Sequence, residues 1–174
     1  VENSALDFGG LTITGNLTAT VSNGAVTQSG VLVIPGTATV SASGQNVTFN
    51  NTSNNFGTIG VTGADVSLID SNALVLGAST VSGTFAVTAS SITNSGDLAI
   101  TGAATFTIAN GQSITLDSSG NNFQSSVTFL ASSGTIANIT IVENSALDFG
   151  GLTITGDLTA TVSNGAVTQS GALV

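Results

Sequence analysis

Short runs in which apolar and polar residues alternate make up most of this chain. In the stretch LTITGNLTATV, residues 11–21, Leu11 and Ile13 alternate with threonines, and Gly15 interrupts the run. Alternation with a period of two is typical of a β-strand, and a glycine inside such a pattern marks a corner. Related stretches follow at residues 32–40, 59–68, 79–87, 98–106 and 152–160. The pattern therefore predicts short strands joined by tight corners.

The spacing of these stretches indicates how the strands are arranged. The apolar residue that stands two places before each corner, or in the matching place, is Ile13, Ile34, Val61, Val81, Ile100 and Phe129, and then Ile154. The intervals are 19 to 29 residues long, which is typical of solenoids whose coils stack and align equivalent residues in ladders. We therefore expect an all-β parallel β-helix with about six coils per 141 residues, and these residues in one inward ladder.

A third strand is predicted in each coil. The segments are 25–29, 46–50, 73–77, 91–95, 113–118 and 145–150. Asn-Gly, Gly-Gly and Asn-Asn pairs between strands are suited to tight corners. An antiparallel sandwich of hairpins is the main alternative, because it has the same turns. It does not explain why the same inward residues return at the length of one coil.

The chain also repeats on a longer scale. Residues 142–174 copy residues 1–33 with two differences, Asn16 against Asp157 and Val31 against Ala172. We divide the chain into one repeat of six coils, residues 1–141, and the start of a second, residues 142–174, and expect a fragment of a longer tandem array. Inside the repeat, SNALVLG at 71–77 resembles NSALDFG at 3–9, and SSGNNF at 118–123 resembles TSNNF at 52–56. This half-way echo indicates an older unit of three coils that was doubled.

Composition excludes most chemistry. The chain has no Lys, Arg, His or Cys, and its nine acids give a net charge of −9. Without cations it has nothing to neutralise phosphates, so nucleic acid and anionic membrane surfaces are poor partners on Coulombic grounds, and we expect neither nucleic acid binding nor membrane insertion. Without His or Cys it lacks the usual bases, thiol nucleophiles and soft metal ligands. No apolar run is long enough for a membrane span. We expect no enzyme, and no catalytic, cofactor-binding or metal residues.

The carboxylates are the remaining reactive groups. Asp65 with Asp70, and Glu2 with Asp7, are close in sequence, and paired carboxylates could support glycoside hydrolysis if they faced each other. Their spacing places them near corners without an aromatic platform, so we interpret them as solvated acids. DSSGNN at 117–122 offers hard oxygen ligands for a weak calcium site, although turn formation is the simpler interpretation.

The strings GLTITGNLTATVSNGAVTQSGVL, SNALVLGASTVSG and ANGQSITLDSSGNNF resemble the repeat regions of giant bacterial surface proteins of the filamentous-haemagglutinin type, exported by two-partner secretion. The resemblance spans the whole chain. It implies a right-handed parallel β-helix, an extracellular or cell-surface location, and a role in adhesion, biofilm or filament formation.

These observations favour a non-catalytic shaft of a long extracellular fibre, whose partner is itself through end-to-end repeats. Outward apolar residues such as Val33 and Leu130 are the expected contacts if rods bundle laterally. The alternative is a module that binds carbohydrate or another surface through Thr, Ser and Asn side chains. Ice binding is disfavoured because the outer row is irregular: Thr14, Pro35, Thr62, Ser82, Thr101, Leu130.

Overall fold

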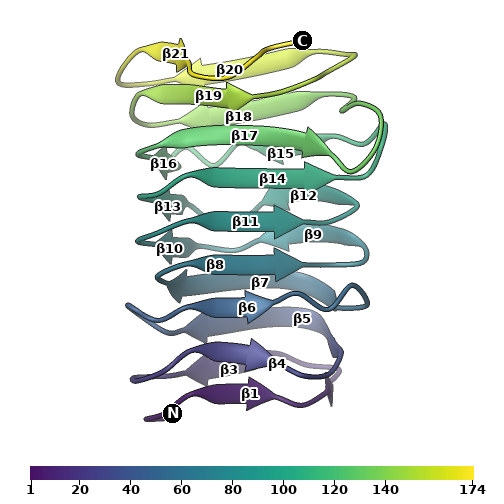
Figure 1. The fold of residues 1–174 in the computed structure, drawn as a ribbon, viewed down its shortest axis with the longest axis vertical. Helices are drawn as coiled ribbons and strands as arrows, with labels where there is room; N and C mark the ends of the chain where they lie inside the picture. Colours follow the sequence, from purple (N-terminus) through teal and green to yellow (C-terminus); the bar gives the residue numbers. More distant parts are fainter.

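The computed structural model describes all 174 residues, which form one solenoid that rises from the N-terminus to the C-terminus (Figure 1). Two sheets face each other across the interior of the solenoid. In Figure 1 the strands of one sheet run left to right at the front, and those of the other run right to left behind them. We call them the front sheet and the back sheet.

The front sheet has nine strands, stacked in chain order. They are β1 (Leu6–Phe8), β4 (Val26–Gln28), β6 (Val47–Phe49), β8 (Val66–Ile69), β11 (Phe85–Thr88), β14 (Ala104–Ile108), β17 (Ser126–Ala131), β19 (Leu147–Gly151) and β21 (Val167–Gln169).

The main stack of the back sheet runs through β3 (Leu17–Thr20), β5 (Leu32–Ser41), β7 (Asn55–Gly63), β9 (Ala73–Leu76), β12 (Ser91–Asn94), β15 (Ile114–Leu116), β18 (Ile139–Glu143) and β20 (Leu158–Val162). Four short strands extend it at the corners: β2 (Leu11–Thr12), β10 (Ser79–Val81), β13 (Leu98–Ile100) and β16 (Asn122–Phe123).

Every pair of strands is parallel, for example Phe85 beside Val66 and Ala104. Each strand pairs with a strand one coil away in the chain, which excludes the antiparallel sandwich and confirms the β-solenoid. The six segments predicted to hold a third strand all contain one, namely β4, β6, β9, β12, β15 and β19.

The structure has one coil more per repeat than the six or so expected from the sequence. From Leu6 in β1 to its copy Leu147 in β19, the front sheet advances by seven strands, and the back sheet advances by seven strands from Leu17 to Leu158. A 141-residue repeat therefore holds seven coils of about 20 residues. Counting by corner glycines gives too few coils, because the strand–glycine–strand pattern is absent from some of them.

The expected single inward ladder is wrong, because the short strands form two ladders at different corners. The first short ladder consists of β2, the start of β5 and the start of β7; the second consists of the end of β7 with β10, β13 and β16. Phe56 and not Val61 follows Ile34 in the first, and Phe123 follows Ile100 in the second. Phe129 lies in the front sheet beside Phe106.

Inward residues from both sheets form one core of 37 buried side chains along the coil. Phenylalanine rings from successive coils pack on each other inside it; the centroids of Phe106 and Phe129 are 5.8 Å apart, and those of Phe106 and Phe85 5.9 Å. Alternation explains this core, because every second residue of a strand faces inward.

The half-way echo has a structural meaning. Leu6 of NSALDFG lies in β1 of the front sheet, whereas Leu74 of SNALVLG lies in β9 of the back sheet. Similarly, TSNNF leads into the first short ladder and SSGNNF into the second. Because seven coils make two units, each unit holds three and a half coils, and equivalent segments fall on opposite sides of the rod.

Candidate functional site

The most elaborate polar contacts lie inside the solenoid, where each short ladder ends. Asn54 and Asn121 are fully buried there, although no hydrophobic pattern would place them inside. The Asn54 side-chain oxygen accepts the backbone N–H of Leu32 at 3.0 Å, and the Asn121 oxygen accepts that of Leu98 at 3.0 Å. Each asparagine therefore replaces a backbone partner that the corner cannot supply.

The side-chain nitrogens of the two asparagines complete the same pattern. Asn54 donates to the Ile69 carbonyl at 3.1 Å, and Asn121 donates to the Leu116 carbonyl at 3.1 Å and the Val142 carbonyl at 3.2 Å. Each amide thus joins three neighbouring coils. These asparagines are structural residues.

A buried carboxylate covers the last strand of each short ladder. Asp70 accepts the backbone N–H of Phe56 at 3.4 Å, and Glu143 accepts that of Phe123 at 3.1 Å. Glu143 also accepts the backbone N–H and the hydroxyl of Ser145, at 2.8 and 2.7 Å. We call Asp70 and Glu143 the capping carboxylates, because each lies at the end of a short ladder that no strand of the next coil extends.

Asp65 and Asp70, proposed as a pair, lie at opposite ends of β8 in different surroundings. Asp70 is buried, whereas Asp65 lies exposed at the corner before β8. The Thr84 backbone N–H and hydroxyl, at 2.8 and 2.9 Å from Asp65, lower the pKa of that carboxyl. The Ser4 hydroxyl, with the N–H groups of Asn3 and Ser4, lowers the pKa of Glu2. Asp65 and Glu2 are ionised and adjoin corners, as interpreted from the sequence, whereas Asp7 lies inside strand β1 and not at a corner.

The oxygens of residues 117–122 do not converge on one point. Asp117 is exposed, and the side-chain oxygen of Asn121 already accepts hydrogen bonds from Leu98 and Asn94. Ser118 instead donates its hydroxyl to Asp97 on the preceding coil at 2.5 Å. The structure contains no group of three or more His, Cys, Asp or Glu side chains arranged to hold a metal ion.

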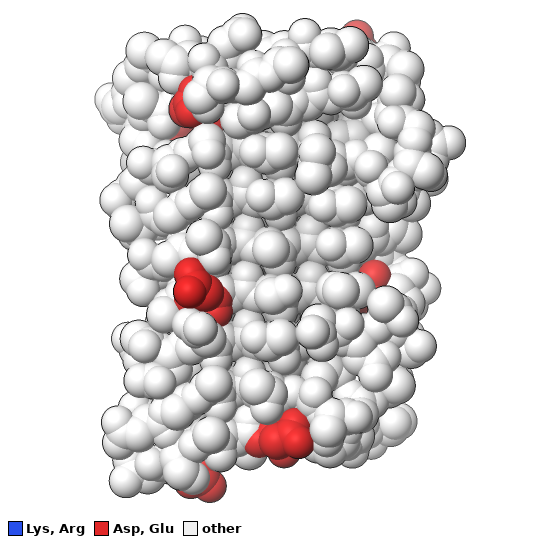
Figure 2. All heavy atoms as spheres, in the orientation of Figure 1, with Lys and Arg blue, Asp and Glu red and all other residues white.

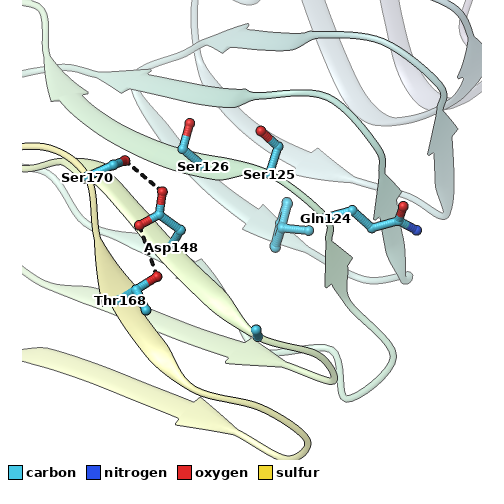
Figure 3. A pocket seen from close by; sticks show the side chains of 8 residues that line it. Gln124, Ser125, Ser126, Asp148, Thr168 and Ser170 are labelled. Carbon is cyan, nitrogen blue, oxygen red and sulfur yellow. Dashed lines mark hydrogen bonds between the residues drawn. The ribbon is translucent and has the colours of Figure 1, made fainter.

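A polar groove lies on the front sheet around Asp148, with a volume of about 360 Å³ (Figure 3). One carboxylate oxygen of Asp148 accepts the Thr168 hydroxyl at 3.1 Å, and the other accepts the Ser170 hydroxyl at 2.6 Å. Ser126 and Gln124 line the groove from the preceding coil, and the Gln124 amide points away from Asp148. Around Asp148 the groove offers hydroxyl and carboxylate groups to a ligand, but no exposed aromatic ring.

Carboxylates form separate spots on an otherwise uncharged surface in the view of Figure 2. No helix in the structure could cross a membrane. Leu130, the predicted lateral contact, is 45% exposed in β17, and Val33 is half-buried in β5. The supposed outer row is not continuous, because Leu130 is beside Thr107 in the front sheet, whereas Thr62 is in the back sheet beside Thr80.

Three segments of the chain, residues 1–62, 63–130 and 136–174, match a family described as repeats of unknown function (DUF5649). Since the matches cover nearly the whole chain, the chain belongs to this family. The boundary after residue 62 supports the interpretation of the 141-residue repeat as two units. No curated protein and no solved structure matches the chain.

Proposed function

We propose that this chain, a member of the DUF5649 repeats, forms the structural shaft of a long fibre on the outside of a bacterial cell. The observation that carries the proposal is the way in which the second copy continues the first. Leu6 lies beside Val26 in β1 and β4, and the copied residues Leu147 and Val167 lie beside each other in β19 and β21. The strand β19 also pairs with β17 of the preceding repeat.

A repeat that stacks on the one before it makes length proportional to the number of repeats. Seven coils at a strand spacing of about 4.8 Å give a rise of about 34 Å per repeat. The surface is polar and uncharged apart from its acids, and two continuous sheets make the coil stiff. In this proposal the shaft supplies reach and stiffness, has no catalytic role, and has other repeats as its partners.

The length test uses the chain and two versions to which one and two further copies of residues 34–174 are joined after Val174. Negative-stain electron microscopy of single particles measures their length. We expect rods that lengthen by about 34 Å per added repeat at constant width. Particles that widen or become globular would overturn the shaft.

The location is tested separately, because a rod could equally lie inside the cell. Antibodies against the chain should label intact cells of the source organism as strongly as permeabilised cells. Labelling only after permeabilisation would place the protein inside and remove the extracellular part of the proposal, while the rod itself would stand.

The groove at Asp148 favours carbohydrate binding as a second candidate function. A carboxylate flanked by hydroxyls provides polar groups that can orient a sugar. Retention of the chain on chitin or cellulose beads, lost in Asp148→Asn and kept in Asp157→Asn, would support it. Asp157 is an exposed corner acid, so its variant controls for the change of charge. Equal retention of both variants, or none by the chain itself, would remove this candidate.

A further inference from the structure

The two capping carboxylates occupy equivalent places in the two units but are not equally satisfied. Glu143 is fully buried, and both of its oxygens accept hydrogen bonds. Asp70 is 4% exposed; its Oδ1 is 3.4 Å from the Phe56 nitrogen, and its Oδ2 is buried without a partner. The side chain of Asp70 is shorter by one methylene, which explains why its hydrogen bond to the ladder is longer.

No positively charged group lies near Asp70 to compensate its charge. Its own backbone N–H donates to the Thr88 carbonyl of β11, and its carboxylate faces Phe56 of β7 and the turn of Ser71 and Asn72 before β9. None of these residues titrates, and the chain has no Lys, Arg or His. Asp65, the nearest acid in sequence, lies exposed beyond the other end of β8.

Burial disfavours the charged form and raises the pKa of Asp70 to about 6, against the opposing effect of the backbone N–H groups of Phe56, Asn72 and Ser71. The carboxyl is therefore ionised at pH 8 and protonated at pH 5, although an ordinary aspartate is ionised at both. The environment of Asp70 differs from that of the corner acid Asp65, whose pKa is lowered.

We propose that Asp70 is a pH-sensitive joint between the two units of the repeat, closed when its side chain is neutral and loosened when it is charged. The loosened element is the last strand of the first short ladder, because the Phe56 N–H depends on this carboxylate. Glu143 keeps the equivalent joint closed by its additional bonds to Ser145. The inference does not depend on the proposed shaft function or on its location.

The direction in which pH changes the stability of the joint follows from the linkage between proton binding and folding. A carboxyl whose folded pKa lies above its unfolded value of about 3.8 binds its proton more tightly in the folded chain. The stabilisation is present below pH 4 and is lost as the pH rises through about 6. A difference of about two pKa units corresponds to about a hundredfold change in the equilibrium between closed and open joint.

Amide hydrogen exchange by NMR on the full chain tests the joint. Protection factors of the Phe56 and Phe123 amides, corrected for intrinsic exchange, are compared from pH 5 to pH 8. We expect protection of Phe56 to fall by about tenfold from pH 5 to pH 8, because the full hundredfold is reached only from below pH 4, and protection of Phe123 to stay constant. Parallel behaviour of the two amides would overturn the proposal.

The variant Asp70→Asn keeps an oxygen for the Phe56 N–H but cannot ionise. It should hold Phe56 protected at every pH, and Asp65→Asn, which removes an exposed acid, should keep the wild-type dependence. If Asp70→Asn does not fold, the carboxyl ¹³C shift of Asp70 in the unaltered chain decides. A midpoint near 6 supports the joint, and a midpoint near 4 overturns it.

Discussion

The first and last 33 residues have almost the same sequence but different surroundings. Val26 is fully buried, whereas its copy Val167 is 53% exposed; Leu32 is fully buried, whereas Leu173 is 39% exposed. The difference arises because Val26 lies between Leu6 and Val47, while Val167 has only Leu147 beside it. In a solenoid, burial is a property of the stack and not of the coil alone.

At the start of the same segment the order of burial is reversed, and the second copy is the more buried one. Phe149 is 3% exposed because β17 lies beneath β19, whereas its copy Phe8 is only half-buried. The Glu143 side chain is likewise buried and bonded to the preceding coil, while the carboxylate of its copy Glu2 accepts hydrogen bonds only from Asn3 and Ser4. Identical residues thus contribute differently to stability according to whether a coil lies above or below them.

The largest expected effect comes from a charge placed at matched positions. Val26→Asp should lower the free energy of unfolding by about 4 kcal/mol, because the carboxylate has no cation to pair with in the core. Val167→Asp should lower it by less than about 1 kcal/mol, because the side chain reaches water. Urea unfolding followed by circular dichroism measures both. Equal losses would contradict the dependence of burial on the stack.

Covering the last coil should remove the difference. Joining residues 34–63 after Val174 supplies the coil that covers Val26 in the first copy. In this longer chain Val167→Asp should cost about 4 kcal/mol, as Val26→Asp does. A cost that stays below about 1 kcal/mol would show that the added residues do not continue the stack.

A smaller effect is expected at the copied glutamates. Glu143→Ala leaves the buried Phe123 N–H without its partner and should cost about 2 kcal/mol. Glu2→Ala removes the same side chain where no coil lies beneath it, and should change stability by less than about 0.5 kcal/mol. Thermal unfolding of the two variants beside the parent chain measures the difference; similar losses would argue against the cap.

The smallest effect is expected where the copies differ in sequence. Val31 and Ala172 both lie at the surface, so Val31→Ala and Ala172→Val should each change the free energy of unfolding by less than about 0.5 kcal/mol. The same unfolding measurements check this. A change above about 1 kcal/mol in either variant would mean that the position packs against the core.

Sequence pattern was sufficient for the fold class and for most strands, because alternation reports which residues face inward wherever a strand is regular. It failed at the corners. Val61 and Phe129 were assigned to one ladder, since both are apolar and suitably spaced, yet Val61 pairs with Val40 and Phe129 with Phe106. The apolar character of a residue does not show to which sheet or ladder its strand belongs.

The polar interior shows the same limit. Asn54, Asn121 and Glu143 are buried because backbone groups of other coils need partners, a requirement that local pattern does not express. The duplicated NNF in TSNNF and SSGNNF was the available signal, since both copies precede a capping carboxylate by one coil. Asp70 was interpreted as a solvated corner acid, and this was wrong.

The sequence by itself determined that this chain is a repetitive, all-β, purely acidic solenoid, because strand alternation, repeat length and the absence of cations are local or compositional properties. Only the tertiary structure decided that seven coils make the repeat, that its two units fall on opposite sides of the rod, and which carboxylates are buried. Those features depend on which coil lies next to which, and contact between coils is a property of the folded stack.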